Sequence, residues 1–317
     1  MSIEEACNTI VKDCMNIKKN EKVLVISDEK SLSIGKAIFK KCKEIGAEAA
    51  HLEIIERKNH GEELPEFIAT AMKSSNVVIA PTTKSLSHTK ARKEACKAGT
   101  RVASMPGITE NMLERTLNAD YENMAILTNK LAKILNNGEN VILNSPGGTK
   151  IKFEINRRKG IADTGILHNK GDFGNLPAGE AYIAPLEGTA NGVVVFDGAV
   201  AGIEKVDEPI IIEVADGKLT DIKGGKAAEE FRKVVFSNKN ENSKNLAELG
   251  IGTNPKARLN SSLLEVEKVM KTVHIAFGDN ASMGGEISAP IHIDGVILKP
   301  TLIIDNRTII KNGEIKV

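Results

Sequence analysis

The chain has 317 residues, of which 41% are hydrophobic and 27% are charged, and its formal net charge is +1 at pH 7. This composition is ordinary for a globular protein, and the length is sufficient for two domains. Because charges of both signs are spread along the whole chain, the sequence excludes the basic surface expected of a nucleic-acid-binding protein. No segment approaches the roughly 18 apolar residues that a membrane-spanning helix requires, so no membrane partner is expected.

The first residues are acidic and lack the basic and apolar regions of a signal peptide. The four cysteines, Cys7, Cys14, Cys42 and Cys96, form no C-x-x-C pair and lie in helical patterns. We therefore expect reduced thiols with a packing role and a cytoplasmic protein.

Glycine usage divides the sequence into two parts. Only five of the 27 glycines lie in residues 1–137, and the remainder follow Asn137. This change predicts an α/β domain at 1–137, followed by a turn-rich α+β domain at 138–317.

Short apolar runs alternate with amphipathic helical patterns in the first part. Strands are predicted at 22–26, 48–55, 76–80 and 101–105, and helices at 34–45, 63–74, 87–98 and 110–117. Such alternation predicts right-handed βαβ crossovers and a parallel sheet that is covered on both faces. The turns after these strands lack the glycine motifs that cradle phosphates, so no nucleotide cofactor is expected.

The second part contains many short β-like runs. Strands are predicted at 141–144, 151–155, 181–184, 192–196, 210–214, 273–277, 291–293 and 301–304, and helices at 226–236, 243–249 and 262–271. Asp-Gly and Asn-Gly pairs at 197–198, 216–217 and 312–313 are typical of hairpin turns. The pattern favours a largely antiparallel sheet.

Two histidines lie in sequence contexts suited to a functional site. His292 and Asp294 are separated by one residue in the strand-like run PIHID, so their side chains point to the same face. His274 lies in the similar run VHIAFG. These residue types at strand ends favour a metal site, although a hydrogen-bonded core histidine is the structural alternative.

Two glutamates also stand out. Glu180 opens an apolar strand after a Pro/Gly-rich segment, and Glu248 lies between apolar neighbours at the end of a predicted helix. A carboxylate in such a place needs a partner if it is buried, and a solvated or capping carboxylate is the alternative interpretation.

Four segments in this order, GNLPAGEAYIAP, LAELGIGTNP, EKVMKTVHIAFG and PIHID, resemble the metal-binding blocks of the aminopeptidase T/aminopeptidase S type metallopeptidases, the thermophilic metalloprotease family. The run SHTKARKEACKAGTRVASMPGITENM is similar to the end of that family's N-terminal α/β domain. The resemblance covers nearly the whole chain.

The resemblance implies a homodimeric metalloaminopeptidase that binds two metal ions, zinc or cobalt, and uses a metal-activated water on peptide substrates. The implied metal ligands are Glu180, Glu248, His274, His292 and Asp294. Glu187 is a candidate for the general base that shuttles the proton to the leaving amine, and a turn residue is the alternative.

One position departs from the family's pattern. The peptidases carry a tyrosine ligand shortly after the first histidine, whereas residues 278–283 here contain none. Asp279 could supply an oxygen ligand in its place, or it could belong to a Gly-Asp-Asn turn.

A related branch resembling the same fold includes the 2,5-dihydroxypyridine dioxygenases, which use one iron(II) ion. On that interpretation His274, His292 and Asp294 form a set of two histidines and one carboxylate. A third interpretation is a binding protein that keeps the fold and has lost its metal ions. The aminopeptidase is the leading prediction, because Glu180 and Glu248 are both present.

Overall fold

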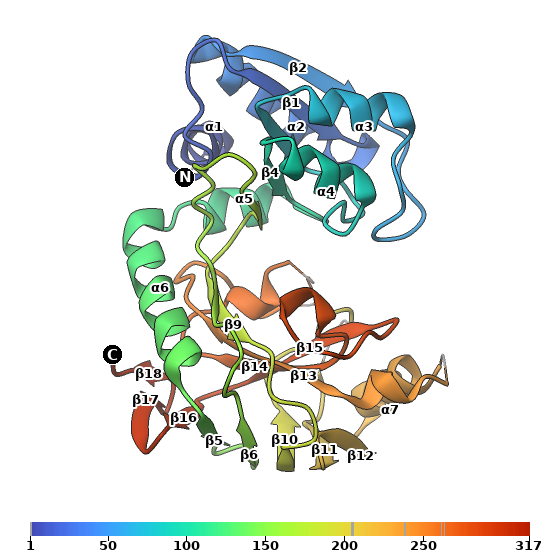
Figure 1. Cartoon of the computed structure of the whole chain (residues 1–317), viewed down its shortest axis with the longest axis vertical. Coiled ribbons are helices and arrows are strands. Elements are labelled where there is room, and N and C mark those ends of the chain that lie inside the picture. Colours follow the sequence, from blue (N-terminus) through green and yellow to red (C-terminus); the bar gives the residue numbers. More distant parts are fainter. Residues whose placement is uncertain (1, 204–205, 238, 261, 263) are drawn as a thin grey trace. The chain divides into compact units, whose positions relative to one another are not determined.

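The computed structural model describes all residues except 1, 204–205, 238, 261 and 263. The chain forms two compact units, Met1–Ala125 with Asp163–Ala178 and Ile126–Ala162 with Gly179–Val317 (Figure 1). The first boundary between the units lies between Ala125 and Ile126, within helix α6 (Tyr121–Asn137), and not after residue 137 as expected. Leu131 and Leu135 of α6 are fully buried in the core of the second unit, so most of this helix belongs there.

The first unit contains a five-stranded parallel sheet with the strand order β2-β1-β3-β4-β8. Its strands are β1 (Lys22–Ser27), β2 (Glu48–Glu53), β3 (Val77–Ala80), β4 (Arg101–Ser104) and β8 (Phe173–Asn175). Its helices are α1 (Ile3–Asn8), a π-helical turn (Thr9–Cys14), a 3-10 turn (Glu29–Ser31), α2 (Leu32–Glu44), α3 (Glu66–Lys73), α4 (Lys90–Lys97) and α5 (Glu110–Thr116). The predicted α/β domain with a parallel sheet is confirmed.

Strand β8 is the part of this sheet that the sequence did not predict. Residues 163–178 return to the first unit, and Phe173 pairs with Val102 of β4 in parallel register. The strand is three residues long and lies among glycines, so its sequence lacks the apolar run that identified the other strands.

The cysteines have the packing role that was expected. Cys7, Cys14 and Cys42 are free and buried, and Cys96 is half-buried. Burial raises the pKa of the Cys7 and Cys42 thiols to about 12. These thiols are therefore protonated at neutral pH and unreactive.

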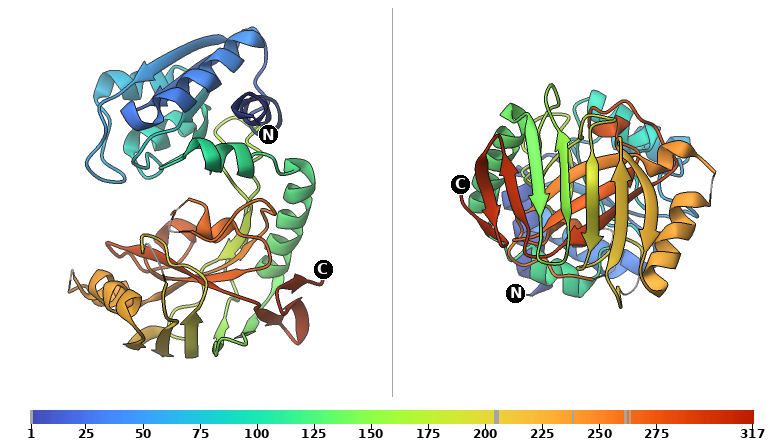
Figure 2. Two further views of the ribbon diagram at one scale, coloured as in Figure 1. Left: turned by 180° about the vertical axis from the view of Figure 1, so that it is seen from behind. Right: turned by 90° about the horizontal axis from the view of Figure 1, so that it is seen from below.

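The second unit is built from two antiparallel sheets. The eight-stranded sheet has the order β12-β11-β10-β6-β5-β16-β17-β18, and its strands lie side by side in the right-hand view of Figure 2. They are β5 (Asn140–Asn144), β6 (Lys150–Glu154), β10 (Asn191–Phe196), β11 (Ile210–Ala215), β12 (Lys218–Lys223), β16 (Thr301–Ile304), β17 (Arg307–Lys311) and β18 (Glu314–Ile315). The predicted turns at 216–217 and 312–313 join neighbouring antiparallel strands of this sheet.

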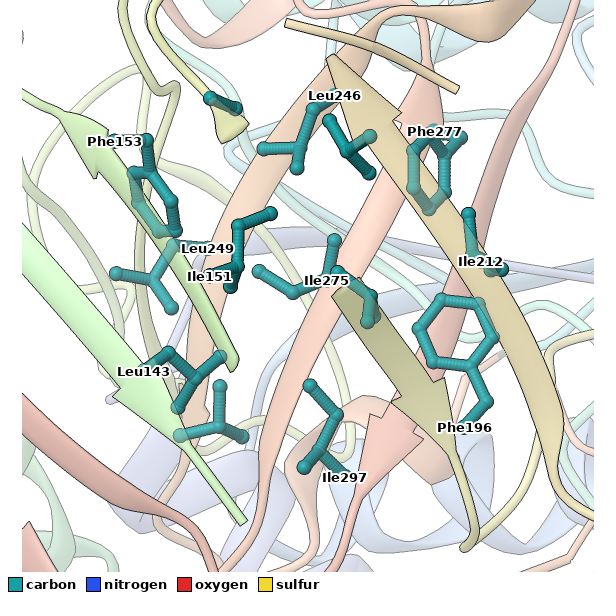
Figure 3. Packing of buried hydrophobic residues seen from close by; sticks show 14 of the residues in the cluster. Leu143, Ile151, Phe153, Phe196, Ile212, Leu246, Leu249, Ile275, Phe277 and Ile297 are labelled. Carbon is teal, nitrogen blue, oxygen red and sulfur yellow. The ribbon is translucent and has the colours of Figure 1, made fainter. Parts of the chain in front are cut away.

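The five-stranded sheet of the second unit has the order β15-β14-β13-β9-β7. Its strands are β7 (Ile161–Asp163), β9 (Glu180–Ile183), β13 (Leu246–Gly252), β14 (Val273–Gly278) and β15 (His292–Ile297). The core lies between the two sheets, where Leu249, Ile275 and Phe277 pack against residues of the larger sheet (Figure 3). The predicted antiparallel α+β domain is confirmed.

Two of the three helices predicted in the second unit are wrong. Helix α7 (Lys226–Phe236) forms as expected, but residues 243–249 enter strand β13 after a 3-10 turn (Glu241–Lys244). All seven residues of β13 are buried, so the strand lacks the alternation that would have identified it. Within the described residues of 262–271, the helical part is a 3-10 turn (Val266–Lys268).

None of the helices in the described part of the chain has the length and apolar character needed to span a bilayer.

The core between the sheets includes a cluster of three aromatic rings. The ring of Phe231, on α7, lies edge-on to the rings of Phe196 and Phe277 at centroid distances of 5.7 and 6.1 Å. Phe231 is fully buried, so Phe231→Ala leaves a cavity between two rigid sheets. We expect this variant to lose about 3–5 kcal/mol of unfolding free energy in urea titrations. A loss below 1 kcal/mol would contradict this packing.

Candidate metal centre

One face of the five-stranded sheet carries the polar residues of the candidate site. In β14 and β15 the side chains of Ile275, Phe277 and Ile293 enter the hydrophobic core. Because side chains alternate along a strand, His274 and Asp294 point to the opposite face. The site thus follows from the same alternation that builds the core.

Strand register brings the predicted residues together from four adjacent strands. Glu248 of β13 and Asp294 of β15 are both paired with Ala276, which lies on β14 between them. His292 is opposite Gly278, and Glu180 of β9 is opposite Gly252. These sequence-distant residues therefore occupy one surface of a single rigid sheet.

The carboxylate of Glu248 lies between the two imidazoles. Its Oε1 is 3.3 Å from His274 Nε2, and its Oε2 is 3.1 Å from His292 Nε2. His274 Nε2 is also 3.3 Å from Glu180 Oε2, and His292 Nε2 is 3.4 Å from Asp294 Oδ1. All five predicted ligands therefore belong to one connected cluster.

The donor atoms form overlapping groups that could each hold a metal ion. Glu180, Glu248 and His274 form one group, and Glu248, His292 and Asp294 form a second, with the ligand atoms of each group within 4.8 Å of one another. A third group joins Glu267 to His274 and Asp294. Imidazole nitrogen with carboxylate oxygen is a donor set suited to iron, zinc, cobalt or manganese.

Access to the cluster differs among its members. His274 is fully buried, and Glu180, Glu248 and Asp294 are 5–6% exposed. The side chain of His292 retains 29% of its accessible surface. Solvent can thus reach the cluster beside His292.

A backbone carbonyl fixes the orientation of His292. Its Nδ1 lies 2.7 Å from the carbonyl oxygen of Asp279 and must donate, because a carbonyl only accepts. The other ring nitrogen, Nε2, is therefore unprotonated in the neutral ring and available to a cation. The Asp279 carboxylate accepts a hydrogen bond from the Ala289 amide at 3.2 Å. The backbone carbonyl of Asp279 thus contacts the site, whereas its carboxylate stabilises the loop that leads to Ala289.

A glycine opposite His274 makes room for the imidazole. Gly250 pairs with His274 across β13 and β14. A β-carbon at Gly250 would lie 1.9 Å from His274 Nε2, which is far inside van der Waals contact. The absence of a side chain at this position lets the ring lie against β13 and reach both glutamates.

Two charged residues of the site were missed in the sequence. Lys268 is completely buried, and its Nζ lies 2.7 Å from Glu180 Oε1. The same ammonium forms an ion pair with the carboxylate of Glu267. Both residues lie in an amphipathic run that was predicted to be a helix, where a Glu-Lys pair normally indicates a solvated face.

The charges of the cluster act on one another strongly. Burial raises the pKa of Glu180, but the Lys268 ammonium and His274 outweigh it and lower that pKa to about 2. Burial lowers the pKa of both imidazoles, yet the adjacent carboxylates hold the pKa values of His274 and His292 well above their usual range. Burial and the charge of Glu180 raise the pKa of Glu267 well above normal. A bound cation would replace the imidazole protons.

The residues present fit a divalent cation. Glu180 Oε2, His274 Nδ1 and Asp294 Oδ1 are buried and have no hydrogen-bond partner among the described residues. Buried polar atoms are nearly always satisfied, so such a concentration at one place needs an explanation. A metal ion would satisfy the carboxylate oxygens and compensate their charge.

Glu187 lies outside these groups of ligands. Its Oε1 accepts hydrogen bonds from Asn280 Nδ2 at 2.8 Å and from the Glu286 amide at 2.9 Å. Its Oε2 pairs with Arg158. These contacts tie together three loops, and they are those of a structural residue. Its role as a general base stays a prediction.

Comparisons with known proteins agree with this architecture. Residues 2–317 match the NicX family model, described as 2,5-dihydroxypyridine 5,6-dioxygenase. A protein of that name from Pseudomonas putida KT2440 is 21% identical over 259 residues, which are 77% of this chain and 72% of the relative.

Two solved structures share the fold over the whole chain. The 2,5-dihydroxypyridine dioxygenase of Pseudomonas putida KT2440 has a TM-score of 0.85 at 17% identity, covering 100% of this chain and 98% of that chain. AmpT from Thermus thermophilus has a TM-score of 0.74 at 16% identity, with 99% of each chain covered. The expected resemblance to both groups of enzymes is confirmed.

Proposed function

The chain belongs to the 2,5-dihydroxypyridine 5,6-dioxygenase family, and from this premise we propose that it is an iron(II)-dependent oxygenase that opens the ring of a small dihydroxylated aromatic compound. The observation that carries the proposal is the approach of Glu248 to both imidazoles, with Asp294 beside His292. It joins the two histidines in one cluster, and Asp294 shares a group of possible ligands with each of them. Two histidines and one carboxylate are the ligand set of non-haem iron(II) oxygenases.

His274, His292 and Asp294 would hold the ion, which would supply open positions for a ring hydroxyl group and dioxygen. The surrounding residues keep these ligands in place. The Asp279 carbonyl fixes the His292 tautomer, and the Glu248 carboxylate lies within 3.3 Å of both rings, where it would compensate the charge of the ion. Because the ligands stand on paired strands, little reorganisation is needed when the ion binds.

The test uses protein purified without oxygen and reconstituted with iron(II). We expect consumption of dioxygen with 2,5-dihydroxypyridine, at one dioxygen per ring opened, as measured with an oxygen electrode and by the loss of the substrate's ultraviolet absorbance. Iron-loaded protein that consumes no oxygen with this compound or with related ring diols would contradict the proposal. Zinc-loaded protein provides the control, since zinc has no redox chemistry.

An aminopeptidase remains the second candidate, and one observation favours it. Glu180, Glu248 and His274 form one possible group of ligands, and Glu248, His292 and Asp294 form another, so the cluster would offer ligands for two ions. This candidate predicts hydrolysis of leucyl-p-nitroanilide after loading with zinc or cobalt, with two ions per chain. The homodimer implied by the resemblance is likewise a proposal, and sedimentation velocity would test it.

A further inference from the structure

We propose that Glu187 is a positioning residue for the metal site, because it fixes the loop whose Asp279 carbonyl orients the ring of His292. This inference rests on the proposed metal site and does not depend on the reaction that the ion supports. The geometry that carries it is a chain of contacts that leads from Glu187 through Asn280 to the Asp279 carbonyl and ends at His292 Nδ1.

The loop at residues 279–291 joins the two strands that carry the histidines. Strand β14 ends at Gly278, and His292 is the first residue of β15 and pairs with Gly278. The Asp279 amide donates a hydrogen bond to the carbonyl of Ile291 at 2.8 Å, so the loop begins and ends beside His292. A change in the path of this loop therefore acts directly on that histidine.

One peptide unit transmits the position of the loop to the imidazole. The carbonyl of Asp279 and the amide of Asn280 belong to the same planar unit. The carbonyl accepts from His292 Nδ1 at 2.7 Å, and the amide donates to the carbonyl of Ile287 at 3.0 Å. Because the unit is planar, neither group can rotate without the other. The position of Asn280 therefore sets the direction of the carbonyl that His292 meets.

The Asn280 side chain lies at the centre of the loop and is completely buried. Its Oδ1 accepts a hydrogen bond from the Ile287 amide at 2.9 Å, and its Nδ2 donates to Glu187 Oε1 at 2.8 Å. A β-carbon at Gly285 would lie 2.0 Å from Asn280 Cγ, so the loop is closely packed around this side chain. The bond to Glu187 ties the centre of the loop to a different segment of the chain.

Glu187 is itself held by several donors. Its Oε2 forms an ion pair with Arg158, whose guanidinium also donates to the carbonyl of Gly284 in the same loop. Its Oε1 accepts from the Glu286 amide at 2.9 Å. Burial raises the pKa of Glu187, but these hydrogen bonds and the Arg158 charge outweigh burial and lower that pKa. The carboxylate is therefore ionised at neutral pH, and hydrogen bonds to an ionised acceptor are stronger than those to a neutral one.

The experiment follows the His292 ring in zinc-loaded protein by heteronuclear NMR, which requires no turnover. We expect the wild type to have zinc on Nε2 and a proton on Nδ1 that exchanges slowly with water. In Glu187→Gln the charge is lost and an amide donor faces Arg158, so this proton should exchange about tenfold faster or more. Zinc affinity, measured by competition with a chelator, should fall by roughly tenfold, as expected when a residue that orients a ligand is changed. The ring signals of His274, which lies outside the loop, should keep their wild-type positions.

Asn280→Asp is the second variant. It keeps the size of the side chain and the acceptor for the Ile287 amide, but it places a second carboxylate against Glu187, and it should produce the same two changes. Glu154→Gln is the matched control, because Glu154 belongs to the same unit and its Oε2 also accepts from a side-chain amide, that of Asn156, at 3.1 Å. This control should match the wild type in proton exchange and in zinc affinity.

A folded Glu187→Gln protein with wild-type proton exchange and wild-type zinc affinity would overturn the inference, and so would equal changes in Glu154→Gln. If neither Glu187→Gln nor Asn280→Asp folds, hydrogen exchange in the wild type decides. The His292 Nδ1 proton and the Asn280 amide proton should then exchange through one common opening, with equal protection after correction for their intrinsic rates. Unequal protection would contradict the inference.

Failure of the metal site and failure of the proposed reaction give different results. A wild type in which zinc does not bind His292 would overturn the metal site and this inference together. A wild type that binds zinc through His292 but consumes no oxygen when loaded with iron would contradict the proposed reaction and leave this inference standing.

Discussion

His292→Ala is expected to weaken iron(II) binding by more than about a hundredfold, which exceeds the effect of losing a residue that only orients a metal ligand. The substitution removes the ligand whose Nε2 faces Glu248 and Asp294. Because the side chain is 29% exposed, its removal leaves a space that water can fill, and the unfolding free energy should change by less than about 1 kcal/mol. Competition with a metallochromic chelator measures the affinity, and urea titration measures the stability.

His168→Ala is the matched control for this variant. His168 is an exposed histidine of the first unit, and its Nε2 contacts the carbonyl of Asp13. This variant should bind iron as tightly as the wild type. Equal affinities in His292→Ala and His168→Ala would show that His292 is not a ligand.

Gly250→Ala is expected to disturb the site through a single added methyl group. The new β-carbon would lie 1.9 Å from His274 Nε2, and His274 has no exposed surface through which it could move away. We expect a loss of about 1–3 kcal/mol of unfolding free energy from overpacking. We also expect at least a tenfold loss of iron affinity, because the displaced ring no longer meets both glutamates.

Gly188→Ala is the control that distinguishes the steric effect of an added methyl group on His274 from a general effect of backbone strain. Gly188 has φ +80°, and a β-carbon there would meet nothing within 4 Å. The control should therefore lose about 1–2 kcal/mol from the left-handed conformation and keep its iron affinity. If Gly250→Ala also kept wild-type iron affinity, the position described for the His274 ring would be incorrect.

Much of the site could be predicted from strand periodicity. The single residue between His292 and Asp294 placed both side chains on one face, and the structure has them on the same face of β15. The approach of these residues to Glu180 and Glu248 could not be predicted in this way. It depends on the pairing of β9 with β13 and of β13 with β14, which joins segments far apart in the sequence.

The residues that were missed share a physical cause. Glu267 and Lys268 carry opposite charges and are neighbours in an amphipathic run, which is typical of an exposed helix. In the structure, the 3-10 turn brings Lys268 to the Glu180 carboxylate. A charged pair can be buried only where residues from other strands supply partners for it. The local sequence around Glu267 and Lys268 does not reveal those partners. Strand β13 was predicted to be a helix for a related reason. A strand that is buried on both faces lacks the alternation of polar and apolar residues that identifies most strands.

We predict that a single divalent ion binds among His274, His292 and Asp294. Anomalous diffraction at the iron absorption edge, from crystals grown without oxygen and loaded with iron(II), tests it most directly. We predict one anomalous peak per chain, within coordination distance of His292 Nε2 and an Asp294 carboxylate oxygen. A peak elsewhere in the chain, or no peak at this cluster under saturating iron, would contradict the claim.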